Sequence, residues 1–197
     1  MHETTLIAPG FHGSGPGHWQ TWMESQVRGA RRVVGIDWEA PVLGAWVAAV
    51  RRQILRSPGR VWLVAHSFGC LVAVAAGVGL GGRVAGAMLV APANPERFSR
   101  QGLRQAGRPG AAGTLSAVLR RQRPGFPSLV VASSNDPWMP VRSLTGWTAT
   151  WGSQLIGIGQ AGHINAESGF GPWPGGLALL EAFQSAVPPR PARHAAC

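Results

Sequence analysis

Short apolar segments alternate with longer amphipathic segments along most of this chain, and this alternation restricts the possible fold more than any other feature. Six short runs are rich in Val, Ile, Leu and Ala, namely residues 6–8, 32–36, 61–65, 87–90, 129–132 and 155–158. Each run ends at a small or polar residue. Continuous apolar runs of this length are typical of strands buried on both faces of a parallel sheet.

The segments between these runs have helical spacing of their apolar residues. Helices are predicted over residues 19–27, 43–54, 71–78, 115–121, 141–151 and 173–187. Strands that alternate with helices predict an α/β fold with about six mostly parallel strands and helices on both faces. In such sheets, ligands bind at the carboxyl ends of the strands, where the strand order reverses.

Length and composition favour one domain over residues 1–187, followed by a disordered tail at 188–197. The net charge is +10, and all 18 basic residues are arginine. Seven arginines lie between Arg97 and Arg123, inside a Gly-rich connection at 94–126 whose only acid is Glu96. We expect a mobile, solvated excursion there.

No nucleic-acid recognition motif accompanies the positive charge, so no nucleic-acid partner is expected.

The sequence also predicts a cytoplasmic protein. No stretch approaches the ~20 apolar residues of a membrane span, and the N-terminus lacks the basic start of a secretory signal. Cys70 and Cys197 do not suggest a disulfide framework, which favours a reduced compartment. The oligomeric state, monomer or dimer, stays open.

The segment Ala65-His66-Ser67-Phe68-Gly69 carries the strongest chemical signal. It follows the run at 61–65 and precedes an apolar helix. A nucleophilic serine on a strained strand-to-helix turn needs small residues two positions before and two positions after it, and Ala65 and Gly69 meet this need. Glycine is the usual residue at the position of Ala65, so the pattern alone is loose. Because the segment lies between a predicted strand and a predicted helix, Ser67 is the candidate nucleophile.

An acid and a base are expected after the last two runs. Asp136 follows the run at 129–132, and His163 follows the run at 155–158. The alternatives are that Asp136 is a turn former before Pro137 and that His163 is an ordinary surface-loop histidine. The order Ser67, Asp136, His163 is that of α/β-hydrolases. In this interpretation His163 takes the Ser67 proton and Asp136 orients the imidazole.

The developing oxyanion needs two backbone N–H donors. We expect one from Phe68, directly after the nucleophile, and the other from Phe11 in the glycine-rich loop after residues 6–8, with His12 as the second choice. A glycine-rich loop before a helix can also bind phosphate. This loop, however, lacks the Gly-Lys-Ser/Thr ending of phosphate-binding loops, and its glycine spacing does not match a dinucleotide-binding motif.

The substrate pocket and cofactors are less constrained. Trp138 and Trp173 lie near the acid and the base in sequence, and we expect them to line the substrate pocket together with His12. The other tryptophans are expected to pack in the core or at its rim. No Cys/His cluster has metal-ligand spacing, so neither a metal nor a cofactor is expected.

Four motifs together resemble a known family. They are Pro9-Gly10-Phe11-His12-Gly13-Ser14-Gly15-Pro16-Gly17-His18-Trp19-Gln20, Ala65-His66-Ser67-Phe68-Gly69-Cys70, Ser133-Ser134-Asn135-Asp136-Pro137 and Gly162-His163-Ile164-Asn165-Ala166-Glu167-Ser168-Gly169. They are similar to those of the retinoblastoma-binding-protein-nine (YdeN-type) serine hydrolases. The resemblance runs from about residue 6 to residue 180. It implies a minimal α/β-hydrolase fold with little or no cap domain and a triad of Ser67, Asp136 and His163.

Members of that family are described as esterases or amide hydrolases, and some are named for a protein-binding role. The basic excursion between Arg97 and Arg123 is longer and more charged than the resemblance leads us to expect. The leading hypothesis is a serine hydrolase that cleaves small carboxylic esters. The alternatives are a thioesterase or amidase on the same triad and a non-catalytic protein-binding member of the fold.

Overall fold

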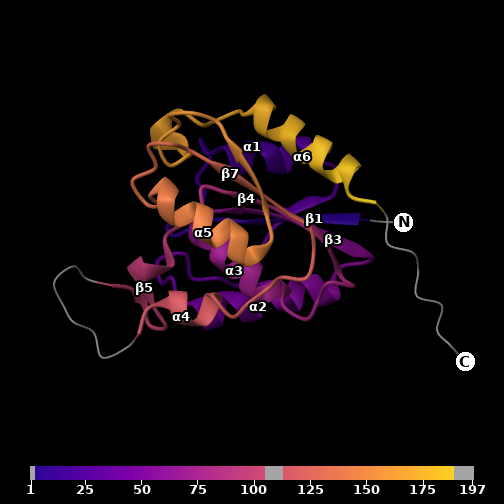
Figure 1. Cartoon of the computed structure of the whole chain (residues 1–197). Helices are drawn as coiled ribbons and strands as arrows, with labels where there is room; N and C mark the ends of the chain where they lie inside the picture. The colour runs from indigo at the N-terminus through magenta and orange to yellow at the C-terminus, as the bar shows by residue number, and fades with distance from the viewer. Residues whose placement is uncertain (1–2, 105–112, 189–197) are drawn as a thin grey trace, which may run out of the picture.

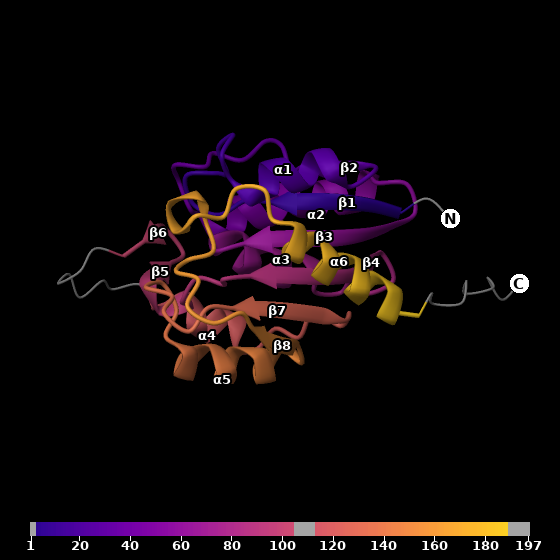
Figure 2. The same ribbon diagram turned by 90° about the horizontal axis from the view of Figure 1, so that it is seen from above.

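A six-stranded parallel sheet forms the centre of the protein in a computed structural model that describes residues 3–104 and 113–188. Figure 2 shows its strands side by side in the order β2-β1-β3-β4-β7-β8. Every neighbouring pair is parallel. The strands are β1 (Glu3–Ala8), β2 (Ala30–Arg32), β3 (Arg60–His66), β4 (Val84–Val90), β7 (Ser128–Ala132) and β8 (Gln154–Gly157).

Helices cover both faces of this sheet (Figure 1). One face packs against α1 (Trp19–Gln26) and α6 (Pro174–Ala186). The other face packs against α2 (Leu43–Arg56), α3 (Phe68–Gly77), α4 (Leu115–Leu119) and α5 (Val141–Trp151). The sequence-based prediction of an α/β fold with helices on both faces is therefore confirmed.

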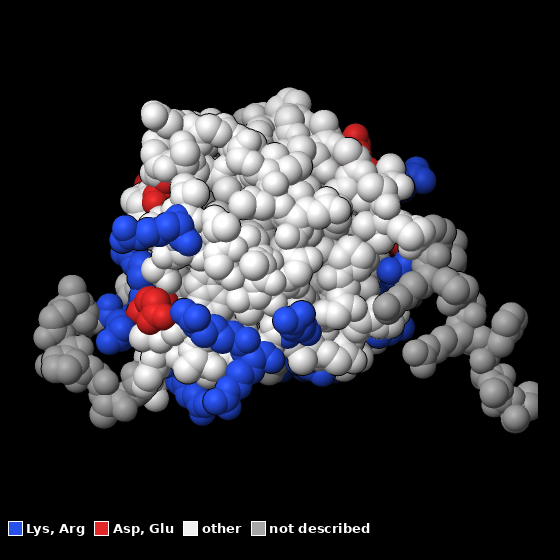
Figure 3. Space-filling view, viewed as in Figure 1, with Lys and Arg blue, Asp and Glu red and all other residues white. Residues whose placement is uncertain are grey.

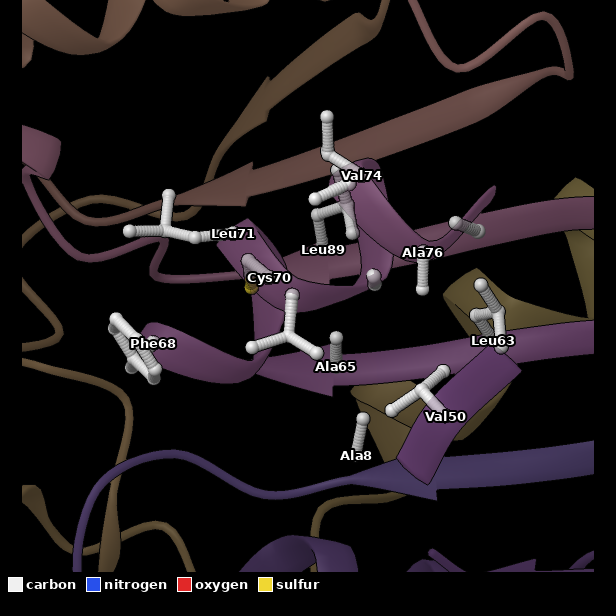
Figure 4. Packing of buried hydrophobic residues seen from close by; sticks show 14 of the residues in the cluster. Ala8, Val50, Leu63, Ala65, Phe68, Cys70, Leu71, Val74, Ala76 and Leu89 are labelled. Atoms are coloured by element: carbon white, nitrogen blue, oxygen red, sulfur yellow. The ribbon is translucent and has the colours of Figure 1, made fainter. Parts of the chain in front are cut away.

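The core is divided in two by the sheet because side chains alternate along each strand. In β3, Leu63 and Ala65 face the α2/α3 side, whereas Trp62 and Val64 face the α1/α6 side. Figure 4 shows the α2/α3 side, where α3 passes close to the ends of β1 and β3. All residues of α3 are buried, as its apolar sequence predicts.

The order of strands reverses at β1. The chain goes from β1 to β2 on one side, then crosses back to β3 on the other side and continues outward through β4, β7 and β8. The loops after β1 and β3 therefore leave adjacent strands at a topological switch point. This is the place where ligands bind in open α/β sheets.

The two edge strands differ from the sequence-based expectation. The run at 32–36 was expected to be a buried strand, but β2 covers Ala30–Arg32, and Val34 beyond it is 69% exposed. In β8 all four residues are exposed, including Leu155 and Ile156. An edge strand has one neighbour only, so an apolar run there need not be buried on both faces.

The connection between β4 and β7 is more structured than a solvated excursion. Its described part contains a 3₁₀ turn, η1 (Pro95–Arg97), a two-stranded antiparallel pair of β5 (Phe98–Ser99) and β6 (Gly102–Leu103), and α4. Phe98, Leu115 and Leu119 are at most 1% exposed and join the core. The apolar side chains therefore anchor both ends of the connection, and residues 105–112 lie outside the described part.

The charged side chains of this connection nevertheless face the solvent. Its exposed arginines are Arg97, Arg100, Arg104, Arg120, Arg121 and Arg123. In Figure 3 basic groups gather at the lower left of the molecule, where Figure 1 shows β5 and α4. The described arginines of the segment are thus exposed, as a solvated segment predicts, but its apolar residues pack into the core, which the prediction did not include.

No separate cap domain is found within residues 3–104 and 113–188, and no helix there is long and apolar enough to cross a membrane. The tail predicted at 188–197 lies outside the described residues except for Pro188.

Candidate active site

Ser67 sits on a sharp turn between β3 and α3 at the switch point. Its φ of 54° and ψ of −123° lie in a region that L residues rarely adopt. Its backbone N–H donates to Val90 O on the neighbouring strand, at 3.1 Å. The strained residue is therefore held by the sheet on one side and by the start of α3 on the other.

The residues around Ser67 must be small, because neighbouring segments of the chain pass very close to them. A Cβ atom on Gly10 would lie 2.7 Å from Ser67 Cβ and 3.3 Å from Ser67 Oγ. A Cβ atom on Gly69 would overlap the backbone oxygens of Ala8 and Pro9. Ala65 is completely buried two positions before the serine. Alanine is thus small enough for the position where the usual pattern has glycine.

Gly69→Ala is expected to destabilise the protein by roughly 1–3 kcal/mol, because backbone atoms must move to make room for the methyl group. Gly146→Ala in α5 is the matched control, since no atom lies within 4 Å of its added Cβ. That change is expected to stabilise the protein by about 0.4–1 kcal/mol. Urea unfolding measures both, and a Gly69→Ala protein as stable as the Gly146→Ala protein would contradict the crowding argument.

Three side chains meet in a hydrogen-bonded row beyond the turn. Ser67 Oγ lies 2.8 Å from His163 Nε2. His163 Nδ1 lies 2.9 Å from Asp136 Oδ1 and 3.0 Å from Oδ2. The side chains of His163 and Asp136 are only 8% and 3% exposed. The structure therefore brings together the three residues that the sequence predicts as nucleophile, acid and base.

The loops after β7 and β8 position the aspartate and the histidine relative to each other. These strands are neighbours, so their loops emerge side by side. Ser133 Oγ accepts a hydrogen bond from Ala161 N–H, and Asn135 Oδ1 accepts one from Gly162 N–H. Asp136 Oδ1 also accepts the N–H of Trp138 at 2.8 Å. The carboxylate is therefore fixed by its own loop while it faces the imidazole.

Two backbone N–H groups are available near the serine. Phe68 N–H is the first of α3, where helical N–H groups have no intrahelical acceptor. Phe11 N–H has no hydrogen-bond partner among the described residues. The second-choice donor, His12 N–H, is already used, because it donates to Trp38 O at 2.9 Å. Phe11 and Phe68 thus stay the predicted oxyanion donors.

The hydrogen-bonded row opens into a cavity of about 370 Å³. Ser67 and His163 line it, together with residues of the loop after β1 and of the segment after His163. Two of the predicted pocket residues, His12 and Trp138, line it. The remaining lining residues are Phe11, Gly13, Gly15, Pro16, Gly17, His18, His66, Phe98, Asn165, Ala166 and Glu167.

Two aromatic groups shape the cavity. The Trp138 ring lies 5.8 Å from the His163 ring, and the Arg97 guanidinium covers it at 3.8 Å. The His12 ring stacks on Phe11 at 3.7 Å, and His12 Nδ1 pairs with Glu39 at 2.7 Å. The basic segment thus reaches the cavity through Arg97 and Trp138.

Trp173 does not line the cavity, which corrects the sequence-based expectation. It precedes α6, and its ring packs edge to face on Trp19 at 5.4 Å and on Phe170 at 5.3 Å. Nearness to His163 in sequence was misleading, because the chain turns through η2 (Ala166–Ser168) before it reaches this tryptophan. Trp173 is therefore partly buried and packs against the core on the α1/α6 side of the sheet.

Two further histidines, His18 and His66, lie at the site, and their sequence positions alone predict no role for either. The His66 ring lies 4.9 Å from the His163 ring and 4.8 Å from the His18 ring. Burial lowers the pKa of His66 well below its ordinary value. Burial, followed by the charge of Arg32, lowers the pKa of His18 to about 4. Both rings are therefore neutral at pH 7.

His18 predicts a dependence of stability on pH. The unfolded chain binds a proton at this residue below about pH 6.5, but the folded chain does so only below about pH 4. Acidification between these values therefore favours unfolding. His18 Nδ1 caps α1 by accepting Gln20 N–H at 3.1 Å. Asparagine at position 18 provides a similar acceptor without the titration.

His18→Asn is therefore expected to reduce the slope of unfolding free energy against pH, by up to about 1.4 kcal/mol per pH unit between pH 6.5 and 4. Urea unfolding at several pH values measures this slope. The remaining slope includes the contribution of His66. Equal slopes in the wild type and the variant would rule out a depressed pKa at His18.

Within the described ranges, no group of three or more His, Cys, Asp or Glu side chains is arranged to hold a metal ion.

The strand, the strained serine turn and the apolar helix at the switch point of a parallel sheet define an α/β-hydrolase fold. The sequence profile of the serine hydrolase family matches residues 5–182, and the chain belongs to this family. Among the curated proteins, no match to the chain is found.

Solved structures agree with this assignment. A protein described as a YdeN-like hydrolase, from Pectobacterium atrosepticum, is 36% identical, with a TM-score of 0.79 over 95% of this chain and 94% of the other. The ydeN gene product of B. subtilis is 18% identical, with a TM-score of 0.71 over 94% and 100%. Est1E from Butyrivibrio proteoclasticus, solved with ferulic acid bound, is 14% identical, with a TM-score of 0.62 over 93% and 87%. The first of these supports a YdeN-type serine hydrolase, and the other two share its fold.

Proposed function

We propose that the protein cleaves small carboxylic esters through an acyl-enzyme formed on Ser67. One observation carries this proposal: the hydrogen-bonded row from Ser67 Oγ through His163 to Asp136, which ends at a cavity. A serine hydroxyl is a weak nucleophile until a base accepts its proton, and the base must be oriented by a third group. His163 and Asp136 are within the distances that these roles need.

Acylation starts when Ser67 Oγ attacks the ester carbonyl carbon while His163 Nε2 accepts the hydroxyl proton. The carbonyl oxygen becomes negatively charged, and the N–H groups of Phe11 and Phe68 are the donors proposed to bind it. Asp136 holds Nδ1–H and stabilises the imidazolium. The carbon–oxygen bond to the leaving group then breaks, and His163 delivers its proton to the departing alkoxide.

Deacylation repeats these steps with water. His163 Nε2 removes a proton from a water molecule as the water oxygen attacks the acyl carbon. The bond to Ser67 Oγ breaks, and the proton held by His163 returns to that oxygen. The products are a carboxylic acid and the free enzyme, and no step uses a metal or a cofactor.

The size of the cavity fits a small-molecule substrate. Its volume of about 370 Å³ lies at the lower end of the ~300–1,000 Å³ range of ligand pockets. A thioesterase or an amidase on the same triad is the nearest alternative, since both leaving groups could take the proton from His163. A non-catalytic binding role would use the exposed arginines between Arg97 and Arg123 and would not require the row of three side chains.

A panel of nitrophenyl esters of increasing acyl length, with matched thioesters and nitroanilides, tests the proposal. We expect the highest kcat/KM on short esters and no turnover by Ser67→Ala. Faster cleavage of the thioesters or anilides would assign the alternative bond. Absence of turnover on every member of the panel by folded wild-type protein would contradict the proposed function.

We also propose a reduced, cytoplasmic location. The described cysteine, Cys70, is a buried free thiol, and burial raises its pKa well above the ordinary value. A buried protonated thiol is unreactive and needs no oxidising compartment.

A further inference from the structure

The residue after the base has an unusual backbone conformation. Ile164 has a φ of 49°, in the left-handed region that a β-branched residue rarely adopts. Such a conformation is strained and persists only where its surroundings hold it in place. Ile164 is completely buried. Some set of contacts must therefore fix the backbone next to His163.

Two buried side chains hold the two consecutive carbonyl groups at this point. His66 Nε2 lies 2.9 Å from the carbonyl oxygen of His163. Trp19 Nε1–H donates to the carbonyl oxygen of Ile164 at 2.8 Å. His66 is the last residue of β3, and Trp19 is the first residue of α1. The backbone around the base is thus bound to two elements that are distant in sequence.

His66 can act only as a donor in this contact. A carbonyl oxygen has no proton to give, so His66 Nε2 must carry the hydrogen. The depressed pKa of His66 keeps the ring neutral. Nδ1 of the neutral ring is then unprotonated, and the tautomer is fixed.

The position of His66 links the nucleophile to the base. Ser67 is the next residue along the chain, and His66 itself is paired with Val90 of β4 in the centre of the sheet. A rigid strand therefore presents the nucleophile and, one residue earlier, a hydrogen bond to the backbone of His163. Two consecutive residues therefore contact His163: His66 at its carbonyl oxygen, and Ser67 Oγ at its Nε2, at 2.8 Å.

We propose that His66 and Trp19 are positioning residues that hold the strained backbone at His163 and Ile164, so that His163 stays within hydrogen-bond reach of Ser67. This inference rests on the proposed function, because it assigns a purpose to the position of the base. Neither residue takes part in proton transfer. Their loss lowers the rate because small displacements of a reacting group, of the order of 1 Å, can cost about 100-fold.

Four variants separate positioning from general packing. His66→Leu removes the donor, whereas His66→Gln provides an amide N–H in place of Nε2–H. Trp19→Phe removes the indole N–H and keeps an aromatic ring. Trp62→Phe is the matched control, because Trp62 belongs to the same core cluster and its indole N–H also makes a hydrogen bond, but to Glu3 at the opposite end of the sheet.

We expect His66→Leu and Trp19→Phe to lower kcat for a nitrophenyl ester by roughly 10- to 100-fold, with KM changed by less than about threefold. His66→Gln should recover most of the lost kcat, and Trp62→Phe should keep the wild-type kcat. Melting temperatures show whether each variant is folded. If His66→Leu does not fold, the pair Trp19→Phe and Trp62→Phe decides.

Two results would overturn the inference while leaving the proposed function intact. One is an active wild type with Trp19→Phe as active as Trp62→Phe. The other is a folded His66→Gln protein as impaired as a folded His66→Leu protein, which would show that the hydrogen bond is not what matters. Absence of ester turnover by the wild type would instead reject the proposed function itself.

Discussion

His163→Gln is expected to lower kcat for ester hydrolysis by about 10⁶-fold. Glutamine can still hydrogen-bond to Ser67 Oγ, but it cannot accept the hydroxyl proton. The nucleophile would therefore stay a neutral hydroxyl group. Single-turnover measurements with excess enzyme and a nitrophenyl ester, corrected for uncatalysed hydrolysis, measure the remaining rate or set its upper limit.

Folding must be checked in the same preparation, because the His163 side chain is only 8% exposed and contacts the Asp136 side chain, which is 3% exposed. Circular dichroism and the melting temperature provide this check. A folded His163→Gln protein with kcat within tenfold of the wild type would remove His163 from the role of base.

Asp136→Asn should reduce kcat by about 10⁴-fold with little change in KM. The amide preserves the shape of the side chain but can donate to Nδ1, which favours the wrong tautomer of His163 and gives no charge to stabilise the imidazolium. The matched control is Asp37→Asn. Asp37 is the only other aspartate of the chain, lies exposed after β2 and accepts the N–H of Glu39.

Steady-state kinetics on a nitrophenyl ester compare the two aspartate variants. The Asp37→Asn protein is expected to keep the wild-type kcat. If Asp37→Asn were the damaging change and Asp136→Asn were harmless, the acid would be assigned to the wrong strand end.

The central part of the fold could be predicted because its strands are buried on both faces. The runs at 61–65 and 87–90 lie within β3 and β4, and each has a paired strand on either side. A strand in the centre of the sheet is buried on both faces, so its residues are apolar and the run is easy to identify. At the edges this does not hold, because β2 consists of one alanine and two arginines and is not apolar.

The described part of the basic connection was predicted less well for a different reason. Its arginines and glycines indicate a solvated segment, but a few apolar side chains decide where it packs. Phe98 contacts Phe68 at a ring distance of 4.6 Å and thereby ties the connection to the first turn of α3. One buried aromatic residue can fix the position of such a segment, because the exposed arginines stay solvated and do not oppose its packing.

The three residues of the row could be predicted because each follows a recognisable strand. The positioning groups could not, since their roles depend on contacts between distant segments. His66 donates to the backbone carbonyl of His163, which lies 97 positions further along the chain. Trp19 reaches Ile164 across 145 positions of the chain. The signal that could have found them was adjacency: His66 precedes the serine, and Trp19 belongs to the His18-Trp19-Gln20 motif.

Reaction with a fluorophosphonate, followed by intact-mass and peptide analysis, tests whether Ser67 is the activated nucleophile. Ser67 Oγ would displace fluoride and form a bond to phosphorus, but only if its hydroxyl is activated. We predict one adduct per wild-type chain, on the peptide that contains Ser67. Ser67→Ala should gain none, whereas Ser25→Ala, which changes an exposed serine of α1, should label like the wild type. A folded wild-type protein that stays unlabelled, or that is labelled equally after Ser67→Ala, would contradict the assignment of Ser67 as the nucleophile.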